Sequence, residues 1–154
     1  MGLPEPLDPT AQRRAAFREA AARGDEAACL ESAVAFSRAE LFEDALAAFK
    51  ELEQLFPARK GEWLRWQGQL LYIQVAYRAK TAEERAACYE RALDCYFQAA
   101  ELGDRSQEFN VVELCEQLAA ETTVPAERSQ AAYARYLALF PQGPGRARVE
   151  KLRR

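Results

Sequence analysis

The chain has 154 residues, of which 49% are hydrophobic and 29% charged, a length and composition that predict one soluble domain with a buried core. Its 24 acidic and 21 basic residues give a net charge of −3, which argues against a general electrostatic attraction to nucleic acid. Only seven Gly and seven Pro occur, and strong helix formers dominate the middle of the chain, so we expect a helical protein.

The first predicted elements follow from residues that start and end helices. Residues 1–8 show no hydrophobic periodicity and are expected to form a flexible N-terminal arm. This arm lacks the basic and apolar parts of an export signal, and no later run reaches the ~18 apolar residues of a membrane span. Asp8 and Pro9 mark the start of a first helix that ends near Gly24, and Asp25 caps a second helix.

The next three helices contain the largest aromatic side chains. A third helix over residues 43–56 stops at the proline that follows it. The fourth predicted helix, residues 61–80, contains both tryptophans. Thr81 with Glu84 three residues later has the pattern of a capping box, so a new helix is expected to begin there and to end at Gly103.

The last third of the chain predicts two further helices and a basic end. These helices cover residues 106–122 and 125–140, and the turn PQGPG closes the second one. Residues 144–154 form a basic C-terminal tail that is compatible with a short helix. No segment has the period-two alternation of a strand, so the domain over residues 9–143 is expected to be all-α.

An internal repeat is the strongest pattern in the sequence. Four helices each contain a set of four residues with the same spacing. In every set the later residues lie four, seven and twelve positions after the first. Each set places packing residues, one of them aromatic, on one helix face and ends with a turn residue. The sets are Arg13, Phe17, Ala20 and Asp25; Ala45, Phe49, Leu52 and Pro57; Ala92, Tyr96, Ala99 and Asp104; and Ser129, Tyr133, Tyr136 and Pro141.

This pattern resembles the second helix of a tetratricopeptide repeat, in which alanine, an aromatic residue and a turn proline follow one another. The first helices agree in part, through Ala33 and Phe36, and through Tyr72, Val75 and Ala76. Steps between turn residues are 32, 47 and 37, against a family period of roughly 34, so the fourth and fifth helices are expected to be longer than usual. The resemblance implies about seven helices in antiparallel pairs, stacked as a short solenoid whose first helices line a concave binding surface.

The fourth helix supplies the main candidate for that surface. Its aromatic and aliphatic residues at three- and four-residue spacing are Trp63, Trp66, Leu70, Ile73 and Tyr77. Such a stripe is either a core face or a groove for an amphipathic helix or an extended apolar peptide. The neighbouring first helices are expected to add Leu30, Val34, Arg38, Phe109 and Val112.

The tail is the one dense basic patch, with Arg146, Arg148, Lys151, Arg153 and Arg154. It is compatible with steering an acidic partner, an anionic surface or nucleic acid, and also with a solvated helix end whose cations complement the terminal carbonyl dipoles. The repeat that begins after the PQGPG turn is incomplete. Either the tail or another chain is therefore expected to cover the apolar face of the preceding helix.

The sequence offers little material for catalysis. It contains no histidine, the commonest general base and metal ligand, and no nucleotide-binding, metalloprotease or nucleophile motif. The cysteines Cys29, Cys88, Cys95 and Cys115 lack metal-site spacing and are expected to be buried free thiols. We therefore expect a cytoplasmic, non-catalytic adaptor without metal or cofactor that binds another protein, the alternative being a self-assembling homo-oligomeric scaffold.

Overall fold

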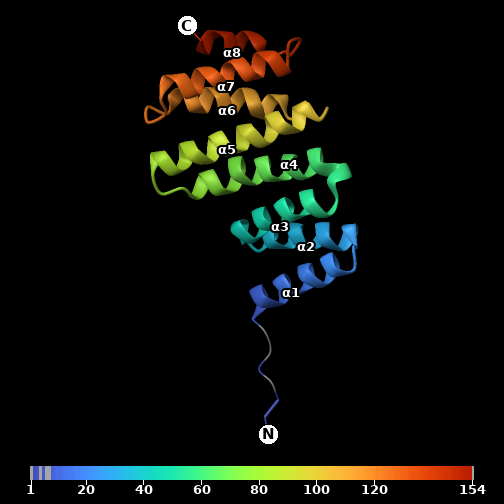
Figure 1. The fold of residues 1–154 in the computed structure, drawn as a ribbon. Coiled ribbons are helices and arrows are strands. Elements are labelled where there is room, and N and C mark those ends of the chain that lie inside the picture. The colour runs from blue at the N-terminus through green and yellow to red at the C-terminus, as the bar shows by residue number, and fades with distance from the viewer. Residues whose placement is uncertain (1, 4, 6–7, 154) are drawn as a thin grey trace. The chain divides into compact units, whose positions relative to one another are not determined.

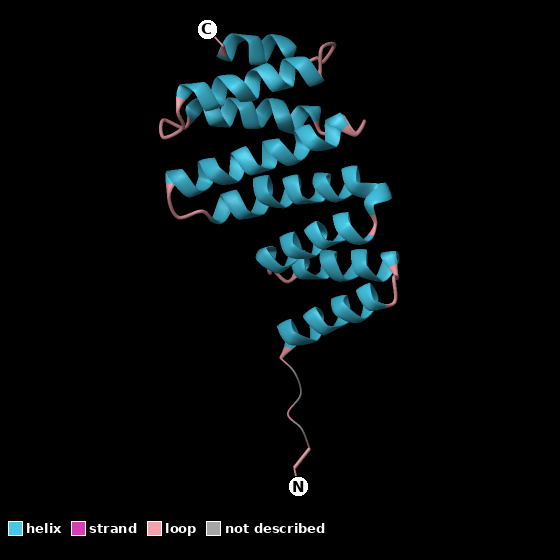
Figure 2. Cartoon of the chain, in the orientation of Figure 1, coloured by secondary structure: helices cyan, strands magenta, loops and turns pink. Residues whose placement is uncertain are grey.

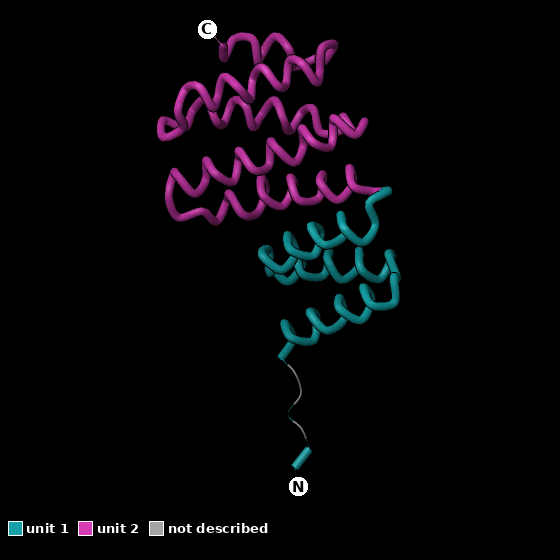
Figure 3. Tube along the Cα trace, in the orientation of Figure 1, with its two compact units in different colours: residues 1–58 teal, residues 59–154 magenta. Residues whose placement is uncertain are grey.

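The computed structural model describes residues 2–3, 5 and 8–153. Across this part of the chain it has eight α-helices and no strand, as the ribbon (Figure 1) and the colouring by secondary structure (Figure 2) show. The prediction of an all-α fold is confirmed. The chain divides into two compact units, residues 1–58 and residues 59–154, which Figure 3 colours separately.

Unit 1 begins with two helices that are capped as the sequence predicted. The carboxylate of Asp8 accepts a hydrogen bond from the backbone N–H of Ala11 at 2.9 Å, and that of Asp25 accepts from Ala28 at 3.1 Å. Gly24 has a φ of 66°, the left-handed conformation that glycine adopts readily at a helix end. The helices of this unit are α1 (Pro9–Ala22), α2 (Glu26–Arg38) and α3 (Phe42–Leu55).

Aromatic and small side chains fill the core of unit 1. The rings of Phe17 and Phe36 lie with their centroids 6.5 Å apart, and Phe49 is completely buried. Ala33 and Ala45 are completely buried as well, which allows α2 and α3 to approach closely. The phenylalanines and alanines of the predicted repeat therefore form its packing face.

Unit 2 begins with a helical run that contains both tryptophans. The run consists of α4, a π turn and a 3-10 turn, and it follows a 3-10 turn at Pro57–Arg59. Figure 1 shows successive helices of this unit running back and forth; α5 packs on α4, and α6 packs on both α5 and α7. The elements are α4 (Lys60–Gln69), the π turn (Leu70–Val75), the 3-10 turn (Ala76–Arg78), α5 (Ala82–Glu101), α6 (Glu108–Ala120), α7 (Ala126–Leu139) and α8 (Arg146–Leu152).

The break between the fourth and fifth predicted helices is a capping box. The hydroxyl of Thr81 accepts from the backbone N–H of Glu84 at 3.1 Å, and the Glu84 carboxylate accepts from the N–H of Lys80 at 2.9 Å. Together these bonds satisfy backbone donors at the start of α5. At the other end of α5, Gly103 has a φ of 98° and terminates the helix as predicted.

The closest approach between α4 and α5 occurs at Gly68. A Cβ atom at this position would lie 2.7 Å from Cε1 of Tyr96, so only glycine fits against the ring. Tyr96 is 1% exposed and Ala92 is completely buried. The small-plus-aromatic pattern of the repeat thus corresponds to tight helix packing in unit 2.

The C-terminal segment is part of unit 2, where α8 packs on α6 and α7. Val149 of α8 is completely buried, and the large side chains at the end of α7, Tyr136 and Phe140, are 0% and 4% exposed. The apolar face of α7 was expected to be covered either by the tail or by another chain. In the structure it is covered by the chain's own tail. None of the helices in the described residues combines the length and apolar character needed to cross a membrane.

Candidate partner-binding surface

The helical run with both tryptophans changes pitch midway. At Leu70, α4 passes into the π turn. The backbone N–H of Ala76 donates to the carbonyl of Leu71, five residues earlier, whereas an α-helix would use the residue four earlier. The π turn thus accommodates one additional residue. Side chains after it are rotated by about 100° relative to an uninterrupted α-helix.

This rotation divides the stripe that the sequence predicted on one helix face. Trp63 is 0% exposed and Leu70 is 4% exposed, so placing these two residues on a binding surface was wrong. Trp66 is partly buried. After the π turn, Ile73 and Tyr77 are 48% and 85% exposed. The prediction assumed 3.6 residues per turn throughout, and the π turn breaks that period. We call Ile73 and Tyr77 the Ile73/Tyr77 patch.

Trp63 is a core residue with a cation over its ring. The Arg59 guanidinium carbon lies 4.6 Å from the ring centroid, within the range of a cation–π contact. Arg59 also donates to the Glu62 carboxylate, at 2.7 Å. Glu62 holds the guanidinium of Arg59 in place over the indole ring. This contact helps to shield Trp63 from solvent, although it lies near the start of α4.

Tyr72 fastens the π turn to two neighbouring helices. Its hydroxyl donates to the Glu113 carboxylate of α6 at 3.2 Å, and its ring meets that of Tyr89 on α5 edge to face, with centroids 6.0 Å apart. Burial, followed by the charge of Glu113, raises the pKa of Tyr72 to about 12. The phenol therefore remains a neutral donor at neutral pH. The sequence identified Tyr72 only as a packing residue, because nothing local points to Glu113.

On α6 the two predicted surface residues have different environments. Phe109 is 66% exposed, whereas Val112 is 2% exposed. The turn before α8 covers Val112 so closely that a Cβ atom at Gly145 would lie 2.3 Å from its Cγ2. Placing Val112 on the binding surface was therefore wrong, because the covering segment is distant in sequence. Phe109 remains a candidate.

The remaining predicted surface residues belong to α2 in unit 1. Leu30 and Val34 are partly exposed and Arg38 is exposed. All three are accessible on their own unit. A groove that they share with α4 and α6 stays a prediction.

The basic tail is largely engaged by its own unit. Arg148 forms an ion pair with Glu116 of α6, and Arg146 pairs with Glu150 at 2.8 Å and donates to the carbonyl of Pro141 at 3.2 Å. Lys151 and Arg153 are exposed, and Arg154 lies outside the described residues. The cations at 146 and 148 therefore hold α8 in place, which weakens the case for a free polyanion-binding patch.

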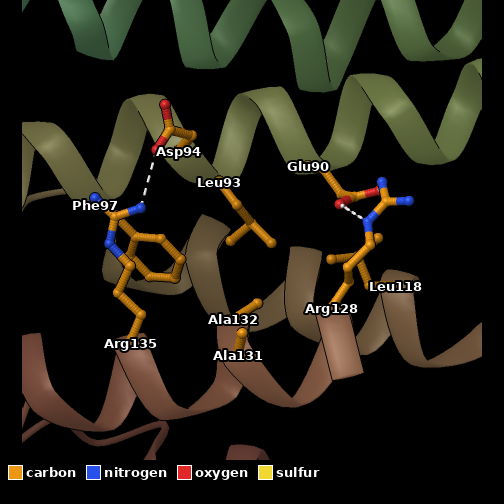
Figure 4. Close-up of a pocket in the computed structure, with 9 residues that line it drawn as sticks. All are labelled: Glu90, Leu93, Asp94, Phe97, Leu118, Arg128, Ala131, Ala132 and Arg135. Carbon is orange, nitrogen blue, oxygen red and sulfur yellow. Dashed lines mark hydrogen bonds and ion pairs between the residues drawn. The ribbon is translucent and has the colours of Figure 1, made fainter. Parts of the chain in front are cut away.

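A pocket of about 180 Å³ lies between α5 and α7, and sequence reasoning did not identify it. Figure 4 shows Leu93 in its centre above the small side chains Ala131 and Ala132. Arg128 pairs with Glu90 at one end. At the other end Arg135 pairs with Asp94 and Glu101, each at 2.9 Å, and covers the ring of Phe97 at 5.0 Å. The ion pairs thus bridge two helices that the alanines leave apart.

Unit 1 has a corresponding pocket of about 210 Å³ between α1 and α3. Ala47 and Ala48 line it, and they follow Ala45 by the same steps by which Ala131 and Ala132 follow Ser129. Ion pairs again bridge the helices, here Arg14 with Asp44 and Arg18 with Glu51, both at 2.8 Å. On the repeat offsets, Asp44 and Glu51 correspond to Arg128 and Arg135. The bridging positions are thus kept and their charges are reversed.

A third pocket, of about 400 Å³, lies beside the turn before α8 and is lined by Arg105, Glu108 and residues 139–144. Glu108 accepts a hydrogen bond from the Tyr136 hydroxyl at 2.7 Å. A Cβ atom at Gly143 would lie 1.8 Å from the Glu108 carboxylate. Gly143 therefore allows this turn to pack closely. The neighbouring polar groups of Glu108 and Tyr136 are hydrogen-bonded to each other.

The cysteines are buried and unbridged, as predicted. Burial raises the pKa of the Cys115 thiol to about 12, so its nucleophilic thiolate is scarce at neutral pH. Among the described residues, no group of three or more Cys, Asp or Glu side chains is arranged to hold a metal ion.

The chain was compared with family models, with curated proteins and with solved structures. Nothing in any of the three comparisons matches it.

Proposed function

We propose that this chain is a non-catalytic adaptor, a short tetratricopeptide-like solenoid that binds a segment of another protein in the cytoplasm. The segment is an amphipathic helix that places its apolar side chains on the Ile73/Tyr77 patch. Phe109 of α6, which is 66% exposed, is proposed as a further contact residue of the same unit.

The observation that carries this proposal is the exposure of the Ile73/Tyr77 patch. Tyr77 is 85% exposed and Ile73 is 48% exposed, although both lie in a helical run whose other large apolar residues are mostly buried. Fully burying an exposed large apolar side chain yields about 1.5–3 kcal/mol. Ile73 is already half-buried, so Tyr77 supplies the larger share, and tyrosine is enriched in binding hot spots. A partner that covers both residues therefore gains more binding free energy than it would from a single exposed residue.

A second candidate function is self-assembly into a homo-oligomeric scaffold. Phe109, which is 66% exposed, favours it because a large exposed aromatic residue on a helix face also suits contact with a second copy. The face of α7 no longer supports this reading, since α8 covers it. Light scattering over a concentration series separates the two functions, because only the scaffold predicts an oligomer at low concentration.

The experiment that tests the adaptor function is partner capture by the double variant Ile73→Ser with Tyr77→Ser. Capture should be lost while circular dichroism shows unchanged helicity, since both residues point to solvent. Leu102→Ser is the matched control, because Leu102 is 57% exposed and directly follows the C-terminal end of α5. Capture of the same partner by the double variant would refute the proposal.

A further inference from the structure

The last helix of unit 2, α8, is short and is held by few contacts. It contains seven residues, fewer than the about 12–15 that an isolated helix needs in water. Its helical form therefore depends on packing against α6 and α7, beside which it lies in Figure 1. Val149 is its one buried side chain, and the others are partly or fully exposed.

Two polar contacts define how α8 is recognised. Arg148 pairs with Glu116 of α6, and these side chains are 46% and 38% exposed, so the pair contributes little to stability. The side-chain amide of Gln130 of α7 donates to the carbonyl of Leu152 at 3.4 Å, and this carbonyl belongs to the last turn of α8, where helical carbonyls lack intrahelical partners. We call the surface that α8 covers, marked by Glu116 and Gln130, the α8-docking face.

The α6 side of the α8-docking face is acidic. Glu113 lies three residues before Glu116, which places both carboxylates on neighbouring positions of the helix surface. The pKa of Arg148 is raised, first by its hydrogen bond to Glu116 and then by the charges of Glu116 and Glu113. A helix that docks here is therefore favoured when it carries a cation at the position of Arg148.

The turn that precedes α8 is fixed more firmly than α8 itself. Phe140 is 4% exposed, and Gly145 is buried so closely against α6 that a Cβ atom there would lie 2.3 Å from Cγ2 of Val112. Opening can therefore be confined to the residues after Gly145. Short segments with few buried contacts are the parts of a fold that open without global unfolding.

We infer that the α8-docking face is a second partner-binding site, which α8 occupies in the free protein and a basic helix of another protein occupies in its place. The partner helix has an arginine directly followed by a β-branched aliphatic residue, as Arg148 and Val149 are arranged, and it ends near Gln130. This site does not involve the Ile73/Tyr77 patch, so the inference goes beyond the proposed function.

The occupant is a different protein because α8 is tethered beside its own docking face. A short tether gives a local concentration on the order of millimolar. The α8 of a second copy offers the same contacts and no others, so the resident helix excludes it at low concentration. A partner displaces α8 only by binding the face more tightly than α8 does.

A labelled peptide with the sequence of residues 145–153 serves as the probe for the α8-docking face. In the full chain, Val149→Asp should release α8, because docking would bury an unpaired carboxylate. This variant should bind the peptide at least about tenfold more tightly than the wild type, in which α8 occupies the face. Ala147→Asp adds the same charge at an exposed position of α8, and it should bind the peptide as weakly as the wild type does. Fluorescence anisotropy measures all three.

A charge exchange tests the arginine requirement. In the Val149→Asp chain, the further change Glu116→Arg should weaken peptide binding about tenfold at low ionic strength. A peptide that carries Arg148→Glu should bind this double variant more tightly than the unchanged peptide does. General damage to the face would not produce such a rescue.

Hydrogen exchange on the wild-type chain tests the opening without any variant. Backbone amides of α8 should exchange through an opening that leaves the amides of α5 protected. Equal protection of α8 and α5 would overturn the inference, because release of α8 would then require global unfolding. Mass spectrometry of the exchanged peptides measures both segments in one experiment.

The other outcomes also overturn the inference and leave the adaptor function at the Ile73/Tyr77 patch standing. Equal peptide binding by the wild type and Val149→Asp would show that the face recognises no separate helix. Loss of the thermal transition in Val149→Asp would show that unit 2 does not stay folded without α8. A wild-type dimer that Val149→Asp dissociates would assign the face to the α8 of a second copy.

Discussion

Gly68 is the residue where packing of α4 on α5 leaves the least room. Replacing it with alanine puts a methyl group 2.7 Å from the Tyr96 ring, so Gly68→Ala should lower the free energy of unfolding by about 1–3 kcal/mol. Gly61→Ala is the control in the same helix, since its Cβ would meet only ordinary contacts of 3.7 and 3.9 Å. It should be neutral or stabilising by up to about 1 kcal/mol, from helix propensity. Urea denaturation compares the two, and equal effects would contradict the close approach.

The hydroxyl of Tyr72 is expected to make the stability of the fold depend on pH. Because the pKa of Tyr72 is raised from 10.0 in the unfolded chain to about 12 in the folded one, its contribution is present below pH 10 and is lost as the pH rises toward 12. Tyr72→Phe should cost about 0.5–1.5 kcal/mol at neutral pH, from the lost bond to Glu113. The variant should also show a smaller decline in unfolding free energy between pH 10 and 12. An identical decline in both proteins, followed by denaturation at several pH values, would contradict this assignment.

At the scale of elements, helix ends were predictable because they depend on local chemistry. Asp8, Asp25 and Thr81 each cap the helix that the sequence assigned to them. The π turn was not predictable in the same way, since its residues continue an apolar pattern that fits an α-helix equally well. Its signature is a five-residue backbone step, as in the bond from the N–H of Ala76 to the carbonyl of Leu71. Because that turn was not foreseen, Ile73 and Tyr77, which are exposed, were assigned to the same helix face as Trp63 and Leu70, which are buried.

The π turn makes a prediction about deletions. Removing Gln74 shortens the step from Leu71 to Ala76 from five residues to four, so an ordinary α-turn keeps both side chains on the core face. This variant should fold, and should lose at most about 1–2 kcal/mol. Deleting Arg91 from α5 is the control, because no additional residue exists there and Ala92, Tyr96 and Ala99 would all rotate out of the core. Thermal unfolding by circular dichroism measures both, and equal destabilisation would contradict the account of the π turn.

At the scale of the whole molecule, composition predicted an all-α chain, and the repeat offsets predicted the buried aromatic residues Phe17, Phe49, Tyr96 and Tyr133. Composition and repeat offsets could not predict which helix faces are covered by segments distant in the sequence. Val112 is buried by a turn more than thirty residues later, and Glu116 is paired with Arg148 from the tail. Such contacts depend on tertiary packing between distant segments, so the hydrophobic periodicity of one helix cannot predict them. The pocket between α5 and α7 escaped prediction for the same reason.

The adaptor function depends on another protein lying against Tyr77, and site-specific photocrosslinking measures this directly. A photoreactive phenylalanine analogue replaces Tyr77, and in a parallel protein it replaces Leu102, which is also exposed. After irradiation in a cell extract, mass spectrometry identifies the crosslinked peptides. We expect crosslinks from position 77, and not from position 102, to one helical segment of a different protein. Crosslinks from position 77 only to a second copy of this chain, or equal labelling from both positions, would contradict it.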